Sequence, residues 1–211
     1  MTDYTPDQVL NLWFPDDGHW EDPERHGAFW NTRMQGGMDE VICRNFAGLT
    51  EAAAKCELDH WAETARGRLA LLIALDQFPR SLWRDTPAAY AQDIKACRLA
   101  LEGIDNGDFA ALALYERQFF IISISHCEGP DHLDRMDLPV ALGEEMETEL
   151  PNALESFRGM ALGQSLRVRD IIARFGRHPH RNAILGRPSS AAEEAYIATG
   201  DFPHVRKVED L

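Results

Sequence analysis

Several hallmarks of common functional classes are missing from this sequence of 211 residues. It contains neither a glycine-rich phosphate-binding loop nor a dinucleotide-binding fingerprint, which argues against kinases and dehydrogenases. No apolar run approaches the roughly 18 residues of a membrane span, and no basic segment followed by an apolar one opens the chain. We therefore expect no signal peptide and no membrane partner, and we predict a cytoplasmic protein.

Paired cysteines and an excess of positive charge are missing too. The four cysteines are widely spread and include no C-x-x-C pair: Cys43, Cys56, Cys97 and Cys127. They indicate free thiols in a reducing compartment. The formal net charge of −14 argues against nucleic acid and anionic membranes as partners, because phosphate binding needs a basic surface. No set of His, Asp or Glu has a spacing diagnostic of metal ligands, so we predict neither a metal nor another cofactor.

Strand-like alternation of polar and apolar residues is also lacking, whereas helical periodicity recurs along the chain. The sequence therefore predicts an all-α fold with about seven to nine helices. Its 45% hydrophobic and 27% charged residues are typical of a globular protein. Because the length suits one domain, we predict a single all-helical domain over residues 1–211.

Apolar periodicity and caps place the helices. Apolar positions keep the helical period over residues 38–54. Residues 64–78 are apolar nearly all round, which predicts a helix at the centre of the fold. Another helix leads to residues 121–125, whose β-branched side chains equally suit an extended run. A long helix is expected over residues 152–175.

Two other segments are expected to lie at the surface or to form loops. Residues 16–37 are rich in glycine, proline and charge, so we predict a loop whose aromatic residues serve the core: Trp20, Phe29 and Trp30. The acidic residues 131–151 predict a solvated surface helix. Ser190 and Glu193 form a capping box for a short final helix.

Three polar blocks stand at the ends of apolar helices: residues 75–80, 126–128 and 174–182. In the first block, Asp76 lies near a helix C-terminus, where the helix dipole disfavours a carboxylate unless a cation compensates it. Asp76 therefore needs an arginine, and Arg80 lies one turn away. Burying each block in isolation would be costly, so we expect the three blocks to meet in space.

The second block holds a candidate general base. His126 and Glu128 are separated by one residue, and in a loop Glu128 can fix the tautomer of His126. The alternative is that His126 caps the preceding helix while Glu128 forms an ion pair. Arg117, in the helix that leads to His126, is a further candidate for this site.

The third block follows a helix that ends at Gly176. Guanidinium groups at the spacing found here can hold a carboxylate or phosphate in a bidentate manner. Its candidate ligand-binding residues are Arg174, Arg177, Arg181 and Asn182, and His180 adds a titrating group. The alternative is that carboxylates of the chain itself bind these arginines, and the candidates are Asp76, Glu116, Glu128 and Asp170.

The candidate site residues form two groups. Acid/base catalysis is assigned to His126, Glu128 and His180. Binding of an anionic ligand is assigned to residues that carry a guanidinium, amide or carboxylate in or near the blocks: Asp76, Gln77, Arg80, Arg117, Arg174, Arg177, Arg181 and Asn182.

The three blocks resemble those of a bacterial family, the domain-of-unknown-function family 924. The resemblance rests on residues 75–80, 126–128 and 174–182, the last followed by Leu185-Gly186-Arg187, and it extends roughly from Val9 to Phe202. It implies a tetratricopeptide-like array of antiparallel helical hairpins. It implies no known activity.

This chain departs from the family pattern at three positions. Cys127 stands where the family usually has serine, which argues against a thiolate mechanism. His178 replaces a usual phenylalanine. Val168 stands where the family often has histidine, so one ligand of any metal site is missing.

Two functions remain open from the sequence. In the first, an enzyme or receptor binds a small anionic ligand through the arginines, with metal-free acid/base chemistry by His126 or His180. In the second, a non-catalytic groove clamps a peptide carboxylate. An enzyme would converge its polar residues on an enclosed pocket, whereas a peptide groove would spread them over several helices. No pattern in the sequence indicates an oligomeric state.

Overall fold

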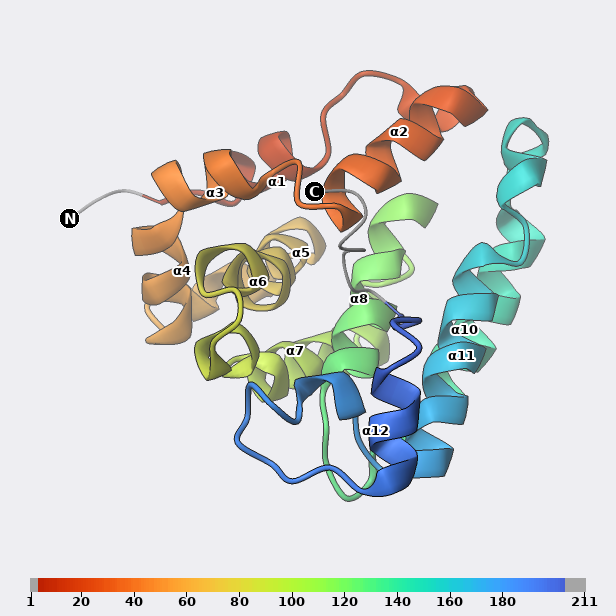
Figure 1. Ribbon diagram of the computed structural model, residues 1–211. Coiled ribbons are helices and arrows are strands. Elements are labelled where there is room, and N and C mark those ends of the chain that lie inside the picture. The colour runs from red at the N-terminus through yellow and green to blue at the C-terminus, as the bar shows by residue number, and fades with distance from the viewer. Residues whose placement is uncertain (1–3, 204–211) are drawn as a thin grey trace.

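The computed structural model describes residues 4–203 as helices joined by short turns (Figure 1). The α-helices are α1 (Pro6–Trp13), α2 (Pro23–Met34), α3 (Asp39–Asn45), α4 (Ala47–Ala54), α5 (Ala65–Leu72), α6 (Phe78–Leu82), α7 (Asp93–Asp105), α8 (Leu114–His126), α9 (His132–Arg135), α10 (Asp137–Glu149), α11 (Met160–Phe175) and α12 (Ala191–Ile197). Short 3₁₀ segments are η1 (His19–Glu21), η2 (Asp59–Glu63), η4 (Pro87–Tyr90), η5 (Asn152–Phe157) and η6 (Pro179–Arg181). No β-strand occurs within residues 4–203, so the predicted all-α class is confirmed. The tetratricopeptide-like stacking of hairpins stays a prediction.

The central helix is the one that the apolar run predicts. α5 continues through a π-helical turn, η3 (Ile73–Gln77), into α6, and the side chains of Leu69, Leu71 and Leu72 are fully buried. Around it pack α1, α7 and α8. The π-turn adds one residue to a helical turn and so rotates the side chains that follow it, which is a common feature of functional segments.

The predicted loop over residues 16–37 is wrong, because most of it is the helix α2. The side chain of Asp22 accepts a hydrogen bond from the Arg25 amide at 3.0 Å, and Pro23 occupies the first helical position. This is a regular N-terminal cap followed by the residue that best tolerates that position. Glycine and charge concealed the apolar period of this segment in the sequence.

Other expected helices are shorter than predicted. The helix over residues 38–54 divides at Phe46 into α3 and α4. The helix expected over residues 152–175 divides at Gly159, which adopts a left-handed conformation with φ of 81°. By contrast α8 stays helical to His126, so the extended alternative for residues 121–125 is wrong.

The acidic segment forms α9 and α10, and it is less solvated than expected. Leu142 and Met146 of α10 are buried, because α10 packs against α8 and α11. α10 and α11 form a hairpin that runs along α8, on the right in Figure 1. The capping box at Ser190 is confirmed, with Ser190 accepting from the Glu193 amide and Glu193 accepting from the Ser190 amide.

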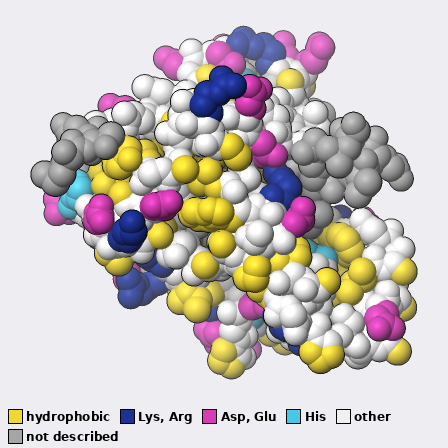
Figure 2. Space-filling view, turned by 60° about the vertical axis from the view of Figure 1, so that its left-hand side comes forward, with side chains coloured by type: hydrophobic (Ala, Val, Ile, Leu, Met, Phe, Trp, Pro, Cys, Tyr) yellow, Lys and Arg dark blue, Asp and Glu magenta, His cyan; other side chains and the backbone are white. Residues whose placement is uncertain are grey.

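Charged side chains of both signs lie close together on the face shown in Figure 2. Arg84 binds Asp39 at 2.6 Å, and within α3 Arg44 binds Glu40, which lies one helical turn before it.

None of the helices within residues 4–203 combines the length and the apolar character needed to cross a bilayer.

A glycine in α5 gives a test of this packing. A Cβ atom on Gly67 would lie 2.1 Å from the backbone oxygen of Trp61, whereas one on Gly163, inside α11, would meet nothing within 4 Å. We expect Gly67→Ala to reduce the free energy of unfolding by about 1–3 kcal/mol, because the backbone must shift. Gly163→Ala should raise it by about 0.5–1 kcal/mol through helix propensity. Urea denaturation of both variants measures the difference, and changes of equal sign would contradict the packing described.

Candidate functional site

The first two polar blocks meet through one buried carboxylate. Asp76 lies in the π-turn and is 1% exposed. Its Oδ1 lies 2.8 Å from Nδ1 of His126, the last residue of α8. Arg80, one turn further along the chain, reaches the same oxygen at 3.2 Å. The prediction that Asp76 needs an arginine is therefore confirmed, and Gln77 adds a side-chain hydrogen bond to its second oxygen.

The third block joins this cluster through Arg181. Its Nη1 donates to Oδ2 of Asp93 at 3.0 Å and to the backbone oxygen of His126 at 2.9 Å. Asp93 also accepts from Arg80 at 3.0 and 3.1 Å. The expectation that the three blocks meet is thus confirmed, in a chain of alternating charges that runs Asp76, Arg80, Asp93, Arg181.

Burial disfavours the charged forms of Arg80, Asp93 and Arg181. It raises the pKa of Asp93, although Arg80 and Arg181 both favour the charged carboxylate. It lowers the pKa of Arg181 despite the nearby Asp93. For Arg80, the two carboxylates outweigh burial and raise the pKa. The carboxylates of the chain itself therefore already balance these guanidinium groups.

Of the two alternatives for Glu128, pairing with His126 or an ion pair, the structure shows the ion pair. Glu128 accepts a hydrogen bond from the His178 amide at 2.6 Å and forms an ion pair with Arg187. Burial disfavours its charge, but these donors lower its pKa overall. His126 points inward from the last turn of α8 toward Asp76, whereas Glu128 lies beyond the helix end and faces the third block. Asp76 occupies the orienting position that the sequence assigned to Glu128.

The remaining candidates surround the cluster at different places. Asn182 is buried, accepts from Arg187 at 3.0 Å and donates to Ser189 at 3.0 Å. His180 is half-buried, and its ring centroid lies 5.2 Å from that of Phe202.

Three of the candidate arginines lie outside the cluster. Arg117 binds Glu149 of α10 at 2.8 Å. Arg177 binds Glu193 at 2.7 and 3.0 Å, with its side chain 30% exposed, and this ion pair lowers the pKa of Glu193. Arg174 is exposed and, with Arg177 and Glu193, lines a shallow cavity of about 360 Å³. Binding of an anion by these arginines stays a prediction.

Within residues 4–203, no group of three or more His, Cys, Asp or Glu side chains is arranged to hold a metal ion.

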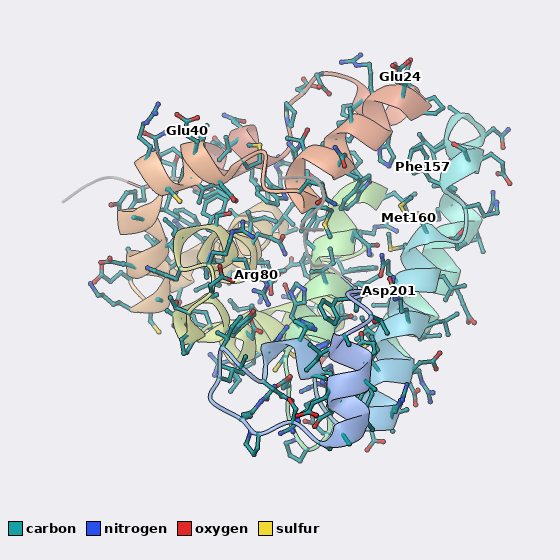
Figure 3. The ribbon with its side chains drawn as sticks, in the orientation of Figure 1. Glu24, Glu40, Arg80, Phe157, Met160 and Asp201 are labelled. Atoms are coloured by element: carbon teal, nitrogen blue, oxygen red, sulfur yellow. The ribbon has the colours of Figure 1, made fainter. Side chains whose placement is uncertain are left out.

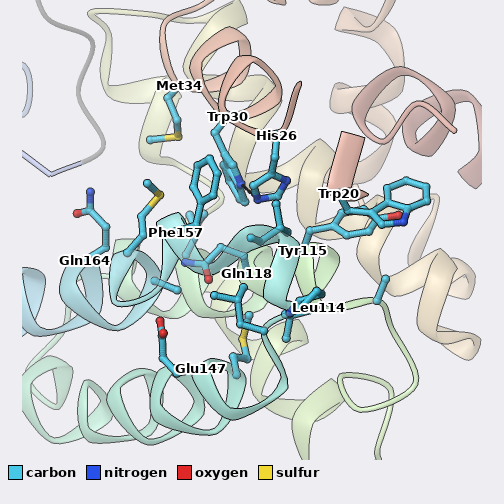
Figure 4. Close-up of a pocket in the computed structure, with 18 residues that line it drawn as sticks. Trp20, His26, Trp30, Met34, Leu114, Tyr115, Gln118, Glu147, Phe157 and Gln164 are labelled. Atoms are coloured by element: carbon cyan, nitrogen blue, oxygen red, sulfur yellow. Dashed lines mark hydrogen bonds between the residues drawn. The ribbon is translucent and has the colours of Figure 1, made fainter. Parts of the chain in front are cut away.

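A larger cavity, which we call the aromatic pocket, lies between α2, α8 and the α10–α11 hairpin (Figure 4). Its volume is about 510 Å³. Its walls are mostly apolar, and the aromatic side chains among them are Trp20, Trp30, Tyr115 and Phe157. Phe157 and Met160 line this pocket, and Figure 3 shows them in a different part of the molecule from Arg80.

Few polar groups line the aromatic pocket. Gln118 of α8 is 8% exposed, and its Oε1 is buried with no hydrogen-bond partner among the described residues. The Oε1 of Gln164 on α11 is likewise buried with no hydrogen-bond partner among the described residues. Glu147 of α10 completes the set, with one carboxylate oxygen bound to the Gly159 amide at 2.8 Å. All three side chains are drawn in Figure 4.

A line of hydrogen bonds runs through the pocket wall. The Trp30 indole N–H donates to Nε2 of His26 at 3.0 Å, and Nδ1 of His26 lies 3.2 Å from Nδ1 of His19. Because an indole can only donate, the proton of neutral His26 lies on Nδ1 and is donated to His19. Burial lowers the pKa of His26 to about 4 and also lowers that of His19, so both rings are neutral at pH 7.

The sequence interpretation missed this pocket. Phe29 is buried in the core as predicted and Trp30 packs against it, but Trp20 and Trp30 also line the pocket. Gln118 and Gln164 stand in helices whose periodicity gives no reason to single them out. One feature of the sequence could have indicated the pocket: residues 16–37 contain two histidines and two tryptophans, which is unusual for a solvated loop.

The contacts of Arg181 in the polar cluster predict a large loss of stability when this residue is replaced. Arg181→Met removes a cation whose side chain is 4% exposed, leaves Asp93 with Arg80 alone and leaves the His126 carbonyl without this donor. We expect a loss of about 3–5 kcal/mol of unfolding free energy. The control Arg174→Met, at an exposed position of the same block, should change it by no more than about 0.5 kcal/mol. Similar losses in both variants, measured by chemical denaturation, would contradict a structural role specific to Arg181.

The histidine line predicts a dependence of stability on pH. The pKa of His26 is about 4 in the fold, and that of an unperturbed histidine is about 6.5. Between these values the unfolded chain binds a proton that the fold excludes, so stability falls as the pH drops from 6.5 toward 4. His26→Gln should reduce this slope by about one proton. Unfolding free energies measured at several pH values test this, and an unchanged slope would contradict the burial of neutral His26.

Comparisons with known proteins cover most of the chain. The family model described as a bacterial protein of unknown function (DUF924) matches residues 9–201. A solved structure of a protein of unknown function from Agrobacterium tumefaciens has a TM-score of 0.72 and 31% sequence identity, covering 92% of this chain and 97% of that one. Among curated proteins, none matches. The resemblance carried by the three polar blocks is thereby confirmed, and the chain belongs to the bacterial DUF924 family.

Proposed function

We propose that this protein binds a small, largely apolar molecule in the aromatic pocket. The observation that carries the proposal is a cavity of about 510 Å³ with mostly apolar walls. Gln118 lines this cavity, and its buried Oε1 has no hydrogen-bond partner among the described residues. Pockets of this size and composition, with a few placed polar groups, are typical of small-molecule sites.

The unpaired acceptors give the pocket a reason to be filled. A buried polar group without a partner costs about 1–3 kcal/mol, and a ligand that donates to Gln118 would remove that cost. Water can serve the same group, but an apolar ligand would also cover the aromatic walls and gain about 25 cal/mol for each Å² buried. A ligand with an apolar body and a hydrogen-bond donor fits both features.

The other functions considered have less support. An anionic ligand at the three blocks would have to compete with Asp76, Asp93 and Glu128, which already bind the arginines there. The Asp76 and His126 pair has the orientation of a carboxylate that positions a general base, and acid/base chemistry at this pair is the weaker alternative. A peptide-clamping groove would spread its polar contacts over an open face, and the observed ones converge instead.

A neutral fluorescent probe tests the proposal. N-phenylnaphthylamine is apolar and carries one N–H donor, and its fluorescence rises in apolar surroundings. We expect it to bind with a dissociation constant in the micromolar range, about −8 kcal/mol. Ala161→Trp, which places an indole in the pocket from α11, should weaken binding at least about tenfold.

The control is Ala173→Trp, an exposed position on the same helix, which should bind the probe as the parent does. Both variants are first compared with the parent by circular dichroism and thermal melting. No binding to the parent, or equal binding to all three proteins, would contradict a site in the aromatic pocket.

A further inference from the structure

We infer that the ligand of the aromatic pocket is a small organic ammonium compound, held with its charged end toward Glu147, Gln118 and Gln164. This inference rests on the proposed function and names the class of molecule that the pocket takes. It follows from the sign of the polar groups in the walls and from the chemistry of the surrounding rings.

Glu147 is the carboxylate among the described residues that line the cavity, and the amides of Gln118 and Gln164 can accept hydrogen bonds as well as donate them. Gln118 and Gln164 each present a buried Oε1 without a partner, and Glu147 presents a carboxylate. Among the described residues that line the pocket, none is Lys or Arg. An ammonium group offers three donors and a positive charge, so it complements this set, whereas a carboxylate would meet repulsion and no cation.

Arg158 is a nearby cation that interacts with both Glu147 and Glu155. Arg158 donates to the backbone oxygen of Glu147 at 2.6 Å, and its other nitrogens bind the carboxylate of Glu155 at 2.7 Å. The Glu147 carboxylate itself is held by the amide of Gly159 through one oxygen. The Gly159 amide therefore positions this carboxylate at the pocket wall, and Figure 4 shows the side chain directed into the cavity.

The aromatic walls favour the same kind of ligand. Trp30, Tyr115 and Phe157 present rings to the cavity, and Trp20 stacks on Tyr115 with ring centroids 5.3 Å apart. The faces of such rings attract cations, and this attraction grows where water is excluded. The methionine side chains of the pocket are polarizable and adapt to an apolar body attached to the charge: Met34, Met146 and Met160.

The histidine in the wall does not oppose the charge. His26 has its Nε2 lone pair bound by Trp30 and shares a proton with His19 through Nδ1, so the ring is neutral in this arrangement. A positive ligand beside it therefore meets no like charge on the His26 ring itself.

Three compounds with one carbon skeleton test the inference: phenylbutylamine, phenylbutanol and phenylbutanoic acid. Each is titrated against the parent protein loaded with N-phenylnaphthylamine, at pH 7 and low ionic strength. We expect the amine to displace the probe about tenfold more effectively than the alcohol, and the acid to be weakest. Added salt should reduce the advantage of the amine, because it screens the charge on Glu147.

A matched pair of variants assigns the effect to one carboxylate. Glu147→Gln should remove most of the difference between amine and alcohol and leave binding of the alcohol unchanged. Glu145→Gln, at an exposed position of α10 that does not line the pocket, should preserve the difference. The ranking of the three compounds in the parent is a test by itself, so the inference stays falsifiable even if a variant fails to fold.

The outcomes separate the inference from the function on which it rests. If alcohol and acid displace the probe as well as the amine does, the preference for ammonium is overturned while the pocket remains a binding site. The inference is also overturned if Glu147→Gln retains the full preference. If neither the probe nor any of the three compounds binds, the proposed function itself is wrong.

Discussion

The buried carboxylate of Asp76 is the constraint on which the polar half of the structure depends. A carboxylate that is 1% exposed, near the end of an apolar helix, is tolerated only when donors and cations surround it. The π-turn directs it inward, His126 and Arg80 bind it, and Arg80 then requires Asp93. Arg181 completes the series. Each added ion pair leaves a charge that the next residue must balance, and this explains why blocks so distant in sequence are packed together.

Helix α8 links this cluster to the aromatic pocket. His126 ends the helix in the cluster, and Gln118 lies roughly 12 Å earlier along the axis, in the pocket wall, at 1.5 Å per residue. The two ends differ in how their polar groups are satisfied. At the cluster, every arginine has a carboxylate of the chain as partner, whereas in the pocket the amide oxygens have none. The cluster also keeps buried atoms without a partner among the described residues, such as Nε of Arg181, but its charges are balanced by the chain itself.

Features that depend on local sequence rules were predicted, and features that depend on contacts formed by folding were not. The need of Asp76 for an arginine, the apolar central helix and the capping box at Ser190 depend on local rules, and all were predicted. The partner of His126 was not predicted, because folding brings Asp76, which is distant in sequence, next to His126. Glu128, its neighbour in sequence, binds the His178 amide instead. The pocket was missed because its walls come from α2, α8 and the α10–α11 hairpin, and an aromatic side chain that borders a cavity has the same sequence pattern as one that fills a core.

The hydrogen-bond line through Trp30, His26 and His19 bears on what the pocket can do with a guest. Both ring nitrogens of His26 are engaged, one as acceptor and one as donor, and the direction of the line is fixed by the indole at its start. The wall therefore contains a histidine that is unavailable as a proton acceptor for a bound molecule unless the Trp30 bond breaks. While that bond persists, the wall of the proposed site offers a bound molecule an aromatic surface at His26 and no free imidazole nitrogen.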